Sequence, residues 1–164
     1  MNLKQWIPAL IGLLVLAACA GTAQAPDGAA EQNGIVIRDA WVRPAFVEGG
    51  NGAAYMIIEN TSNADDTLIG ASASFAEVVE VHETFEEMDN MEDDGDMRHG
   101  EMMGMRQIPE LTIPAGETVT LEVGGYHVML IGVQETLEMG ETAEVTLIFE
   151  NAGEITVEAE VREQ

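Results

Sequence analysis

Hydrophobic and polar residues alternate along most of the chain from residue 35 onward. The alternation is clear at Val119, Leu121 and Val123, which are separated by a threonine and a glutamate. Successive side chains of a β-strand point to opposite faces of a sheet, so a period of two predicts strands with one buried face. On this basis, strands are predicted at residues 35–42, 53–60, 67–74, 77–83, 118–123, 126–133, 143–150 and 154–161.

Turn-forming residues separate the predicted strands, as in EGGNG at 48–52 and PAGE at 114–117. The segment 149–158 is typical of a β-hairpin, with Asn151 and Gly153 able to take positive φ. No segment predicts a helix longer than a turn or two. So many short strands within about 130 residues predict an all-β fold, an antiparallel two-sheet sandwich with Greek-key connections.

The N-terminal part of the chain lacks this alternation. An apolar run from Ile7 to Ala18 would rise only about 18 Å as a helix, which is too short for a bilayer core of about 30 Å. That length suits the hydrophobic part of an export signal. The residues LAAC at 16–19 resemble a bacterial lipobox, so we predict that residues 1–18 are removed and that Cys19 is acylated. The alternative for Cys19 is a free or buried thiol.

Residues 19–34 are small, polar and without periodicity, and they are predicted to form a flexible tether to one folded domain at 35–164. The sequence carries 30 acidic residues against six basic ones, for a net charge of −24. This charge excludes nucleic-acid binding and disfavours contact with anionic lipids, so the membrane is reached by the lipid anchor only. Cations and basic partners would be attracted, although simple solubility explains the charge equally well.

Several kinds of chemistry are excluded by the residues that the sequence lacks. Cys19 is the only cysteine, so the folded domain has no thiolate nucleophile, thiolate metal ligand or disulfide. No Ser/His/Asp arrangement and no glycine-rich phosphate loop are present either. The sequence therefore does not predict an enzyme, and a blue-copper electron carrier is nearly excluded because it needs a cysteine thiolate.

One segment, residues 83–105, does not fit the strand pattern and is predicted to be an inserted loop. It holds nine acidic residues between Glu83 and Glu101, and six of the ten methionines. Methionine usually fills gaps in a hydrophobic core, but no core can form among so many carboxylates. These methionines therefore call for a chemical explanation; they are Met88, Met91, Met97, Met102, Met103 and Met105.

The three histidines lie in or beside this segment. His82 ends a predicted strand where the segment begins, His99 lies within the segment, and His127 lies two residues before Met129 in another predicted strand. The i, i+2 spacing puts His127 and Met129 on one face of that strand, while Tyr126, Val128 and Leu130 are assigned to the core. Imidazole and thioether together favour copper, and thioether favours Cu(I). The segment lacks the spacing of a calcium loop, and zinc would use more histidine or a cysteine.

The sequence resembles the periplasmic copper chaperones of the PCu(A)C type. That family has a histidine, ten residues, a methionine, 21 residues, and then His-x-Met. Here Met105 is followed by 21 residues and by HVM at 127–129, and the resemblance extends from about residue 35 to 162. Further stretches that match are HET at 82–84, MGMR at 103–106, 113–133 and 145–161. The one departure is that 22 residues separate His82 from Met105.

The resemblance implies a cupredoxin-like sandwich that binds one Cu(I) through His82, Met105, His127 and Met129, with Cu(II) as a further candidate. Met103 and Met102 could substitute for Met105, because the longer gap leaves open which methionine completes the site. The extra residues could also add a second, looser copper site; its candidate ligands are Met88, Met91, Met97 and His99.

The resemblance further implies delivery of copper to the dinuclear copper centre of cytochrome c oxidase, in its subunit II, beside a Sco-type thiol protein. The protein is expected to be a monomer on the periplasmic or outer face of a bacterial membrane. Two alternatives stay open at this point. One is a copper-buffering or resistance lipoprotein that sequesters copper with the Met-rich segment, and the other is a metal-free adhesion or assembly domain.

Overall fold

The computed structural model describes residues 29–87 and 102–164. This part of the chain contains eleven strands and no helix, so none of it forms a helix that could cross a membrane. All eight predicted strands are confirmed, and β1, β6 and β7 are additional. The strands are β1 (Ala30–Gln32), β2 (Ile35–Arg43), β3 (Gly52–Asn60), β4 (Asp66–Ser72), β5 (Ala76–Glu87), β6 (Met102–Gln107), β7 (Leu111–Ile113), β8 (Thr118–Leu121), β9 (Tyr126–Val133), β10 (Thr142–Phe149) and β11 (Gly153–Val161).

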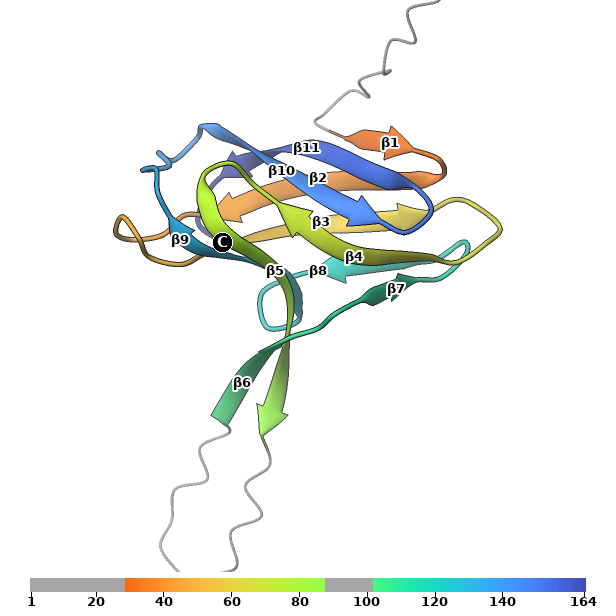
Figure 1. Cartoon of the computed structure of the whole chain (residues 1–164), viewed down its shortest axis with the longest axis horizontal. Coiled ribbons are helices and arrows are strands. Elements are labelled where there is room, and N and C mark those ends of the chain that lie inside the picture. Colours follow the sequence, from red (N-terminus) through yellow and green to blue (C-terminus); the bar gives the residue numbers. More distant parts are fainter. Residues whose placement is uncertain (1–28, 88–101) are drawn as a thin grey trace, which may run out of the picture.

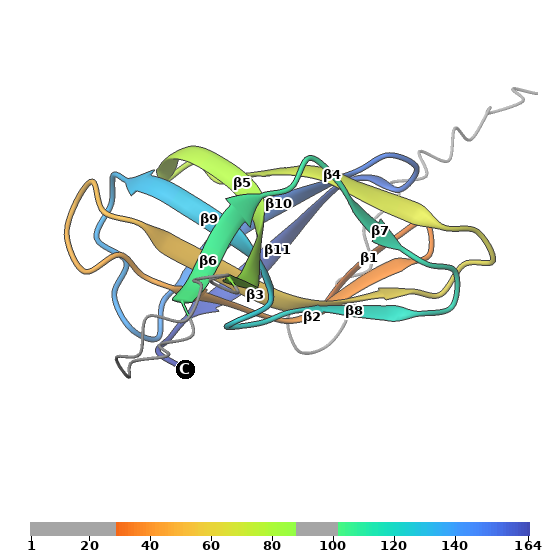
Figure 2. The same ribbon diagram turned by 90° about the horizontal axis from the view of Figure 1, so that it is seen from below.

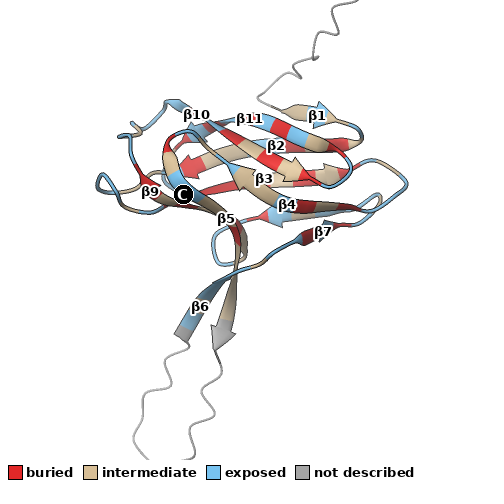
Figure 3. Cartoon of the chain, viewed as in Figure 1, coloured by how far each residue is buried: buried red, intermediate tan, exposed pale blue. Residues whose placement is uncertain are grey.

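The strands form one continuous sheet that curls over on itself to enclose a core (Figures 1 and 2). Its order is β6-β5-β9-β8-β3-β2-β11-β10-β4-β7, with β1 beside β2. The all-β sandwich is therefore confirmed. Most pairings are antiparallel as expected, but β11 pairs with β2, and β8 with β9, in parallel. Figure 3 shows buried residues interspersed with less buried ones along the strands. The fully buried side chains include Ile37, Ile58, Leu68, Leu130, Leu147 and Val145.

The predicted tether is wrong for its last residues, because the folded domain begins at β1 and not at Ile35. β1 pairs antiparallel with β2 through a two-residue turn at Asn33 and Gly34, whose φ angles are 49° and 88°. Asn-Gly favours the turn type that requires positive φ at both positions. The Gln32 amide also donates to the Ala152 carbonyl at 2.5 Å, which ties β1 to the turn after β10.

The predicted loop is wrong for residues 83–87 and 102–105, which belong to β5 and β6. These two strands pair antiparallel and project from the sandwich as a ribbon (Figure 1). Cross-strand contacts stabilise the ribbon: Arg106 forms an ion pair with Glu83, and its guanidinium carbon lies 5.2 Å from the Phe85 ring centroid. Such pairs do not depend on hydrophobic alternation, so the pattern of residues did not show this ribbon.

The hairpin of β10 and β11 is confirmed, with Gly153 at φ 82°. Of the two residues able to take positive φ, Gly153 does so and Asn151 does not. The turn is instead held by the buried carboxylate of Asp66 at the start of β4. Its oxygens accept hydrogen bonds from the backbone N–H groups of Asn151 and Ala152, both at 2.9 Å.

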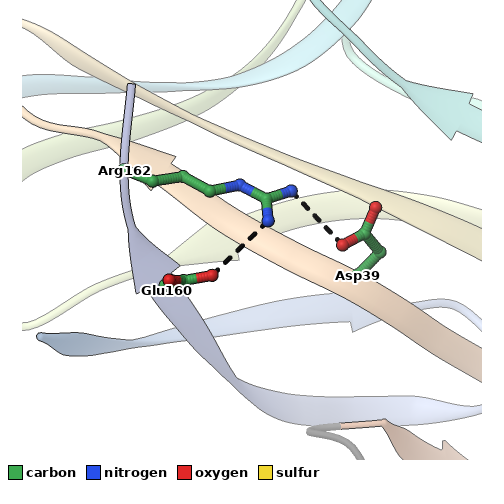
Figure 4. Close-up of polar contacts among 3 residues, drawn as sticks. All are labelled: Asp39, Glu160 and Arg162. Carbon is green, nitrogen blue, oxygen red and sulfur yellow. Dashed lines mark hydrogen bonds and ion pairs between the residues drawn. The ribbon is translucent and has the colours of Figure 1, made fainter. Parts of the chain in front are cut away.

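A β-bulge in β2 changes which side chains face the core. The register shifts by one residue between Arg38 and Trp41, and Asp39 in the bulge has φ 51°. Such a shift moves every later side chain to the other face. Trp41 therefore lies outside, opposite Tyr55, and their rings stack at 4.4 Å. Arg162 covers Trp41 at 5.2 Å, and its guanidinium contacts Asp39 at 3.3 Å and Glu160 at 3.4 Å (Figure 4).

Candidate metal centre

His82 and His127 are directly opposite each other on neighbouring strands. They are Cα partners in the antiparallel pairing of β5 with β9, and their ring centroids are 5.8 Å apart. Residues that oppose each other in a ladder lie on the same face of the sheet. The structure thus brings together two histidines that are 45 positions apart in the sequence.

The strand register places the two predicted thioether ligands on this same face. Met129 follows His127 by two residues, and Met105 on β6 is opposite Thr84, which follows His82 by two residues. Directly opposite Cβ atoms lie about 5 Å apart and diagonal neighbours about 7–8 Å. The four predicted ligands therefore share one face of β6, β5 and β9, and their joint binding of a metal stays a prediction.

His127 is more buried than a residue on an outer face would be, with an exposed fraction of 4%. Val128 and Leu130 are fully buried in the core as predicted, whereas Tyr126 is half-buried. On its own face, His127 lies beside Tyr55 of β3, with the ring centroids 6.3 Å apart. Rings on both neighbouring strands thus shield its imidazole from water.

The hydrogen bond of His127 determines which of its nitrogens is free. Nδ1 lies 3.1 Å from the carbonyl oxygen of Gly125, and a carbonyl can only accept, so Nδ1 carries the proton. Nε2 then keeps its lone pair. Burial lowers the pKa of His127 below its usual 6.5; the Gly125 hydrogen bond opposes this shift, and the nearby charges of His82 and Arg43 add to it. The imidazole is therefore held in the neutral state that binds metals.

His82 has the same arrangement with its nitrogens exchanged. Nε2 lies 2.8 Å from Oε2 of Glu80 and donates to this carboxylate. Nδ1 is buried and has no hydrogen-bond partner among the described residues. A buried nitrogen without a partner costs about 1–3 kcal/mol, so native structures rarely keep one without a reason. A histidine that ligates a metal characteristically donates its other N–H to a carboxylate or carbonyl, as both histidines do here.

Glu80, Gly125 and Tyr55 support this centre, but the sequence did not single them out. The spacing of Glu80 two residues before His82 was a usable signal, because it puts both side chains on one face. Gly125 and Tyr55 gave no such signal. Within residues 29–87 and 102–164, no three or more His, Cys, Asp and Glu side chains are grouped to hold a metal ion. The candidate set pairs its two histidines with methionines instead.

The other predicted ligands fall into two groups. Met103 and Met105 lie on β6 with exposed fractions of 55% and 61%, and Met102 is the first residue of that strand. The remaining predictions lie outside the described residues; they concern Cys19, Met88, Met91, Met97 and His99.

Solved structures define the class to which this fold belongs. The chain is similar to the copper-bound PCuAC domain of PmoF2, with 27% identity, a TM-score of 0.62, and coverage of 83% of this chain and 98% of that domain. It is similar to the apo solution structure of DR1885 from Deinococcus radiodurans, with 29% identity, a TM-score of 0.57, and coverage of 99% and 97%. The Cu(I) form of DR1885 gives 30% identity, a TM-score of 0.54, and coverage of 90% and 86%. The fold is thus the cupredoxin-like sandwich of PCuAC domains, as the sequence predicted.

Within this class, the chain belongs to the LpqE-like family of lipoproteins, whose family model matches residues 35–161. A relative, Lxx21020 of Leifsonia xyli subsp. xyli (strain CTCB07), also carries a name that assigns it to the lipoproteins. It is 32% identical over 155 residues, which cover 92% of this chain and 84% of the relative. The predicted resemblance to the PCu(A)C type is confirmed.

Proposed function

We propose that this protein is an extracytoplasmic copper chaperone that binds one Cu(I) through His82, His127, Met129 and Met105. One observation carries the proposal: the two histidines oppose each other, and each leaves one nitrogen free while the other donates a hydrogen bond. The orphaned Nδ1 of His82 is the clearest sign, because a bound metal ion would satisfy it. The copper-bound forms of PmoF2 and DR1885 support the same conclusion.

The donor set explains both the choice of ion and its release. Two neutral imidazoles and two thioethers are soft, uncharged ligands, which favour Cu(I) over Zn²⁺, Mg²⁺ or Ca²⁺. The histidines are also good ligands for Cu(II), which we propose as a second, weaker cargo. Because Met105 is exposed, an acceptor can reach the centre from the side of β6 and replace one ligand at a time.

We further propose that the cargo goes to the dinuclear copper centre in subunit II of cytochrome c oxidase, with a Sco-type thiol protein as a second partner. This part is supported by the PCuAC class of the fold. Acylation of Cys19 would hold the protein on the outer side of a bacterial membrane, and the lipoprotein names of the family and of its relative support such an anchor.

The test is an anaerobic Cu(I) titration of the mature chain against a competing chelator. We expect one tight site, and a loss of at least about tenfold in affinity for His127→Ala and Met129→Ala. Met139→Leu is the control for the loss of a thioether, because Met139 is an exposed methionine in the turn between β9 and β10. Wild-type affinity in both site variants would refute the assignment of the ligands. Transfer is tested separately by mixing the Cu(I)-loaded chain with an apo fragment of subunit II; no movement of copper would refute delivery.

Copper buffering is a second candidate function, because the exposed Met103 follows the centre on β6 and further methionines lie in the adjoining sequence. Stoichiometry separates the two functions. A chaperone binds one ion tightly, whereas a buffer takes up several ions with similar, weaker affinities. If the chain takes up no Cu(I), both copper functions fail and a metal-free assembly domain is left.

A further inference from the structure

The ribbon of β5 and β6 extends the face of the metal centre away from the sandwich (Figure 1). Met105 and Met103 alternate along β6, so both side chains are on this face. They are the Cα partners of Thr84 and Glu86, which follow His82 at steps of two residues along β5. The register therefore aligns two thioethers in a row that begins beside His82 and leads toward the end of the ribbon.

The opposite face of the ribbon is packed and fixes how the methionines are presented. The Phe85 ring covers Gly104 so closely that a Cβ atom at this glycine would lie 2.6 Å from the ring. The Arg106 guanidinium lies over the Phe85 ring, 5.2 Å from its centroid, and is ion-paired with Glu83. One face of the ribbon is thus held by these side-chain contacts, while Met103 and Met105 on the other face are more than half exposed.

We propose that Met103 and Met105 form a second, weaker Cu(I) site on the ribbon, and that Cu(I) passes through it on the way to and from the His82–His127 centre. This inference rests on the proposed function. Two thioethers can hold Cu(I), which accepts low coordination numbers and soft ligands. The net charge of −24 attracts the cation to the surface, where these two sulfur atoms are accessible.

The transfer step needs no redox change and no proton. Met105 belongs to both sites, so its bond to Cu(I) is kept while the bond to the Met103 sulfur breaks and a bond to an imidazole nitrogen forms. The receiving nitrogens already have free lone pairs, because the hydrogen bonds to Glu80 and Gly125 place the protons on the opposite ring nitrogens. Copper stays Cu(I) throughout, and the ion is never released to water.

The experiment compares Met103→Leu with Met139→Leu in the mature full-length chain. Leucine keeps the size and apolar character of an exposed methionine but removes its sulfur, so neither variant is expected to alter folding. Two quantities are measured: the equilibrium affinity for Cu(I), and the stopped-flow rate at which Cu(I) is taken from a chromogenic chelator complex. For Met103→Leu we expect wild-type affinity at the tight site and a transfer rate about tenfold lower. For Met139→Leu both quantities stay as in the wild type.

Binding at the ribbon is measured separately in a His127→Ala variant, in which the tight centre is disabled. With ¹³C-labelled methionine methyl groups, added Cu(I) is expected to shift the signals of Met103 and Met105 but not that of Met139. A wild-type transfer rate in Met103→Leu, or no shift of these signals, overturns the inference and leaves the proposed function intact. A loss of tight affinity in Met103→Leu also overturns it, because Met103 would then be a ligand of the centre. Absence of any tight site in the wild type instead refutes the proposed function.

Discussion

The two histidines of the centre use opposite ring nitrogens for their supporting hydrogen bonds. His127 donates from Nδ1 to a backbone carbonyl, which no side-chain substitution can remove, whereas His82 donates from Nε2 to the carboxylate of Glu80. A side-chain substitution can therefore remove the hydrogen-bond acceptor that orients His82 but not the one that orients His127. His82 depends on a single side chain, and its ligating atom under this arrangement is Nδ1.

Glu80 is accordingly expected to act as a positioning residue. Glu80→Ala removes the acceptor that holds His82, so Cu(I) affinity should fall by about tenfold, within the range found when such supporting groups are lost. Glu80→Gln keeps a side-chain acceptor and should lose less. Chelator competition measures the affinities, and the ¹⁵N chemical shifts of His82 report its tautomer. Glu144→Ala, which removes an exposed carboxylate on β10, is the control. Equal effects of Glu80→Ala and Glu144→Ala would contradict this role.

The lowered pKa of His127 gives a pH dependence to the stability of the apo protein. In the unfolded chain the imidazole titrates near 6.5, whereas burial lowers this pKa in the folded state. As the pH falls through 6.5, the unfolded state binds the proton first, so this residue makes the free energy of unfolding decrease below that pH. The slope should flatten below the folded-state pKa. Urea unfolding at several pH values tests this, with NMR titration of the His127 ring giving the pKa directly. His127→Gln should lose this component, and a folded-state pKa above 6.5 would disprove the account.

The strands differ in how far they could be predicted from the sequence. The eight predicted strands carry alternating aliphatic residues, whose burial dominates their formation. β1 and β7 have three residues each, too few for a period of two to stand out. β6 depends on contacts across the ribbon, and its methionines and charges favour no element by themselves. The pairing of His82 with His127 follows from the register of β5 with β9, which joins segments distant in sequence, and the family motif indicated it. Glu80 could have been found from its i, i+2 spacing to His82 on one strand, whereas the position of Tyr55 beside His127 required the register between strands.

Asp66 shows how one carboxylate can hold a turn between two other strands. Asp66→Ala should lower the free energy of unfolding by about 3 kcal/mol, because it leaves the buried N–H of Ala152 and the N–H of Asn151 without their charged acceptor. Chemical denaturation measures the change. The neighbouring Asp65 accepts one exposed hydrogen bond, from the N–H of Ala115, so Asp65→Ala should cost less than about 1 kcal/mol. Similar losses of unfolding free energy in both variants would show that the buried hydrogen bonds of Asp66 stabilise the fold no more than the exposed one of Asp65.

The whole molecule combines a strongly acidic surface with few positive charges. Of the arginines in the described ranges, Arg38 and Arg106 each form one ion pair with a carboxylate, and Arg162 forms two. These pairs are exposed and contribute about 0–1 kcal/mol each. The remaining carboxylates repel one another across the sandwich, and repulsion within a compact state lowers its stability. Repulsion is therefore expected to outweigh the ion pairs, while the same negative field attracts cations to the protein surface.

Salt should consequently stabilise the apo protein. Raising the ionic strength shortens the Debye length from about 30 Å at 0.01 M to about 8 Å at 0.15 M, which screens the many repulsions more than it weakens the few arginine ion pairs. The melting temperature should therefore rise with NaCl, as thermal unfolding followed by circular dichroism would show. Tetramethylammonium chloride at equal ionic strength is the control, because its bulky cation screens charge without binding carboxylates closely. If only NaCl raised the melting temperature, specific sodium binding would be the cause; if neither salt did, the acidic surface would carry no net penalty for folding.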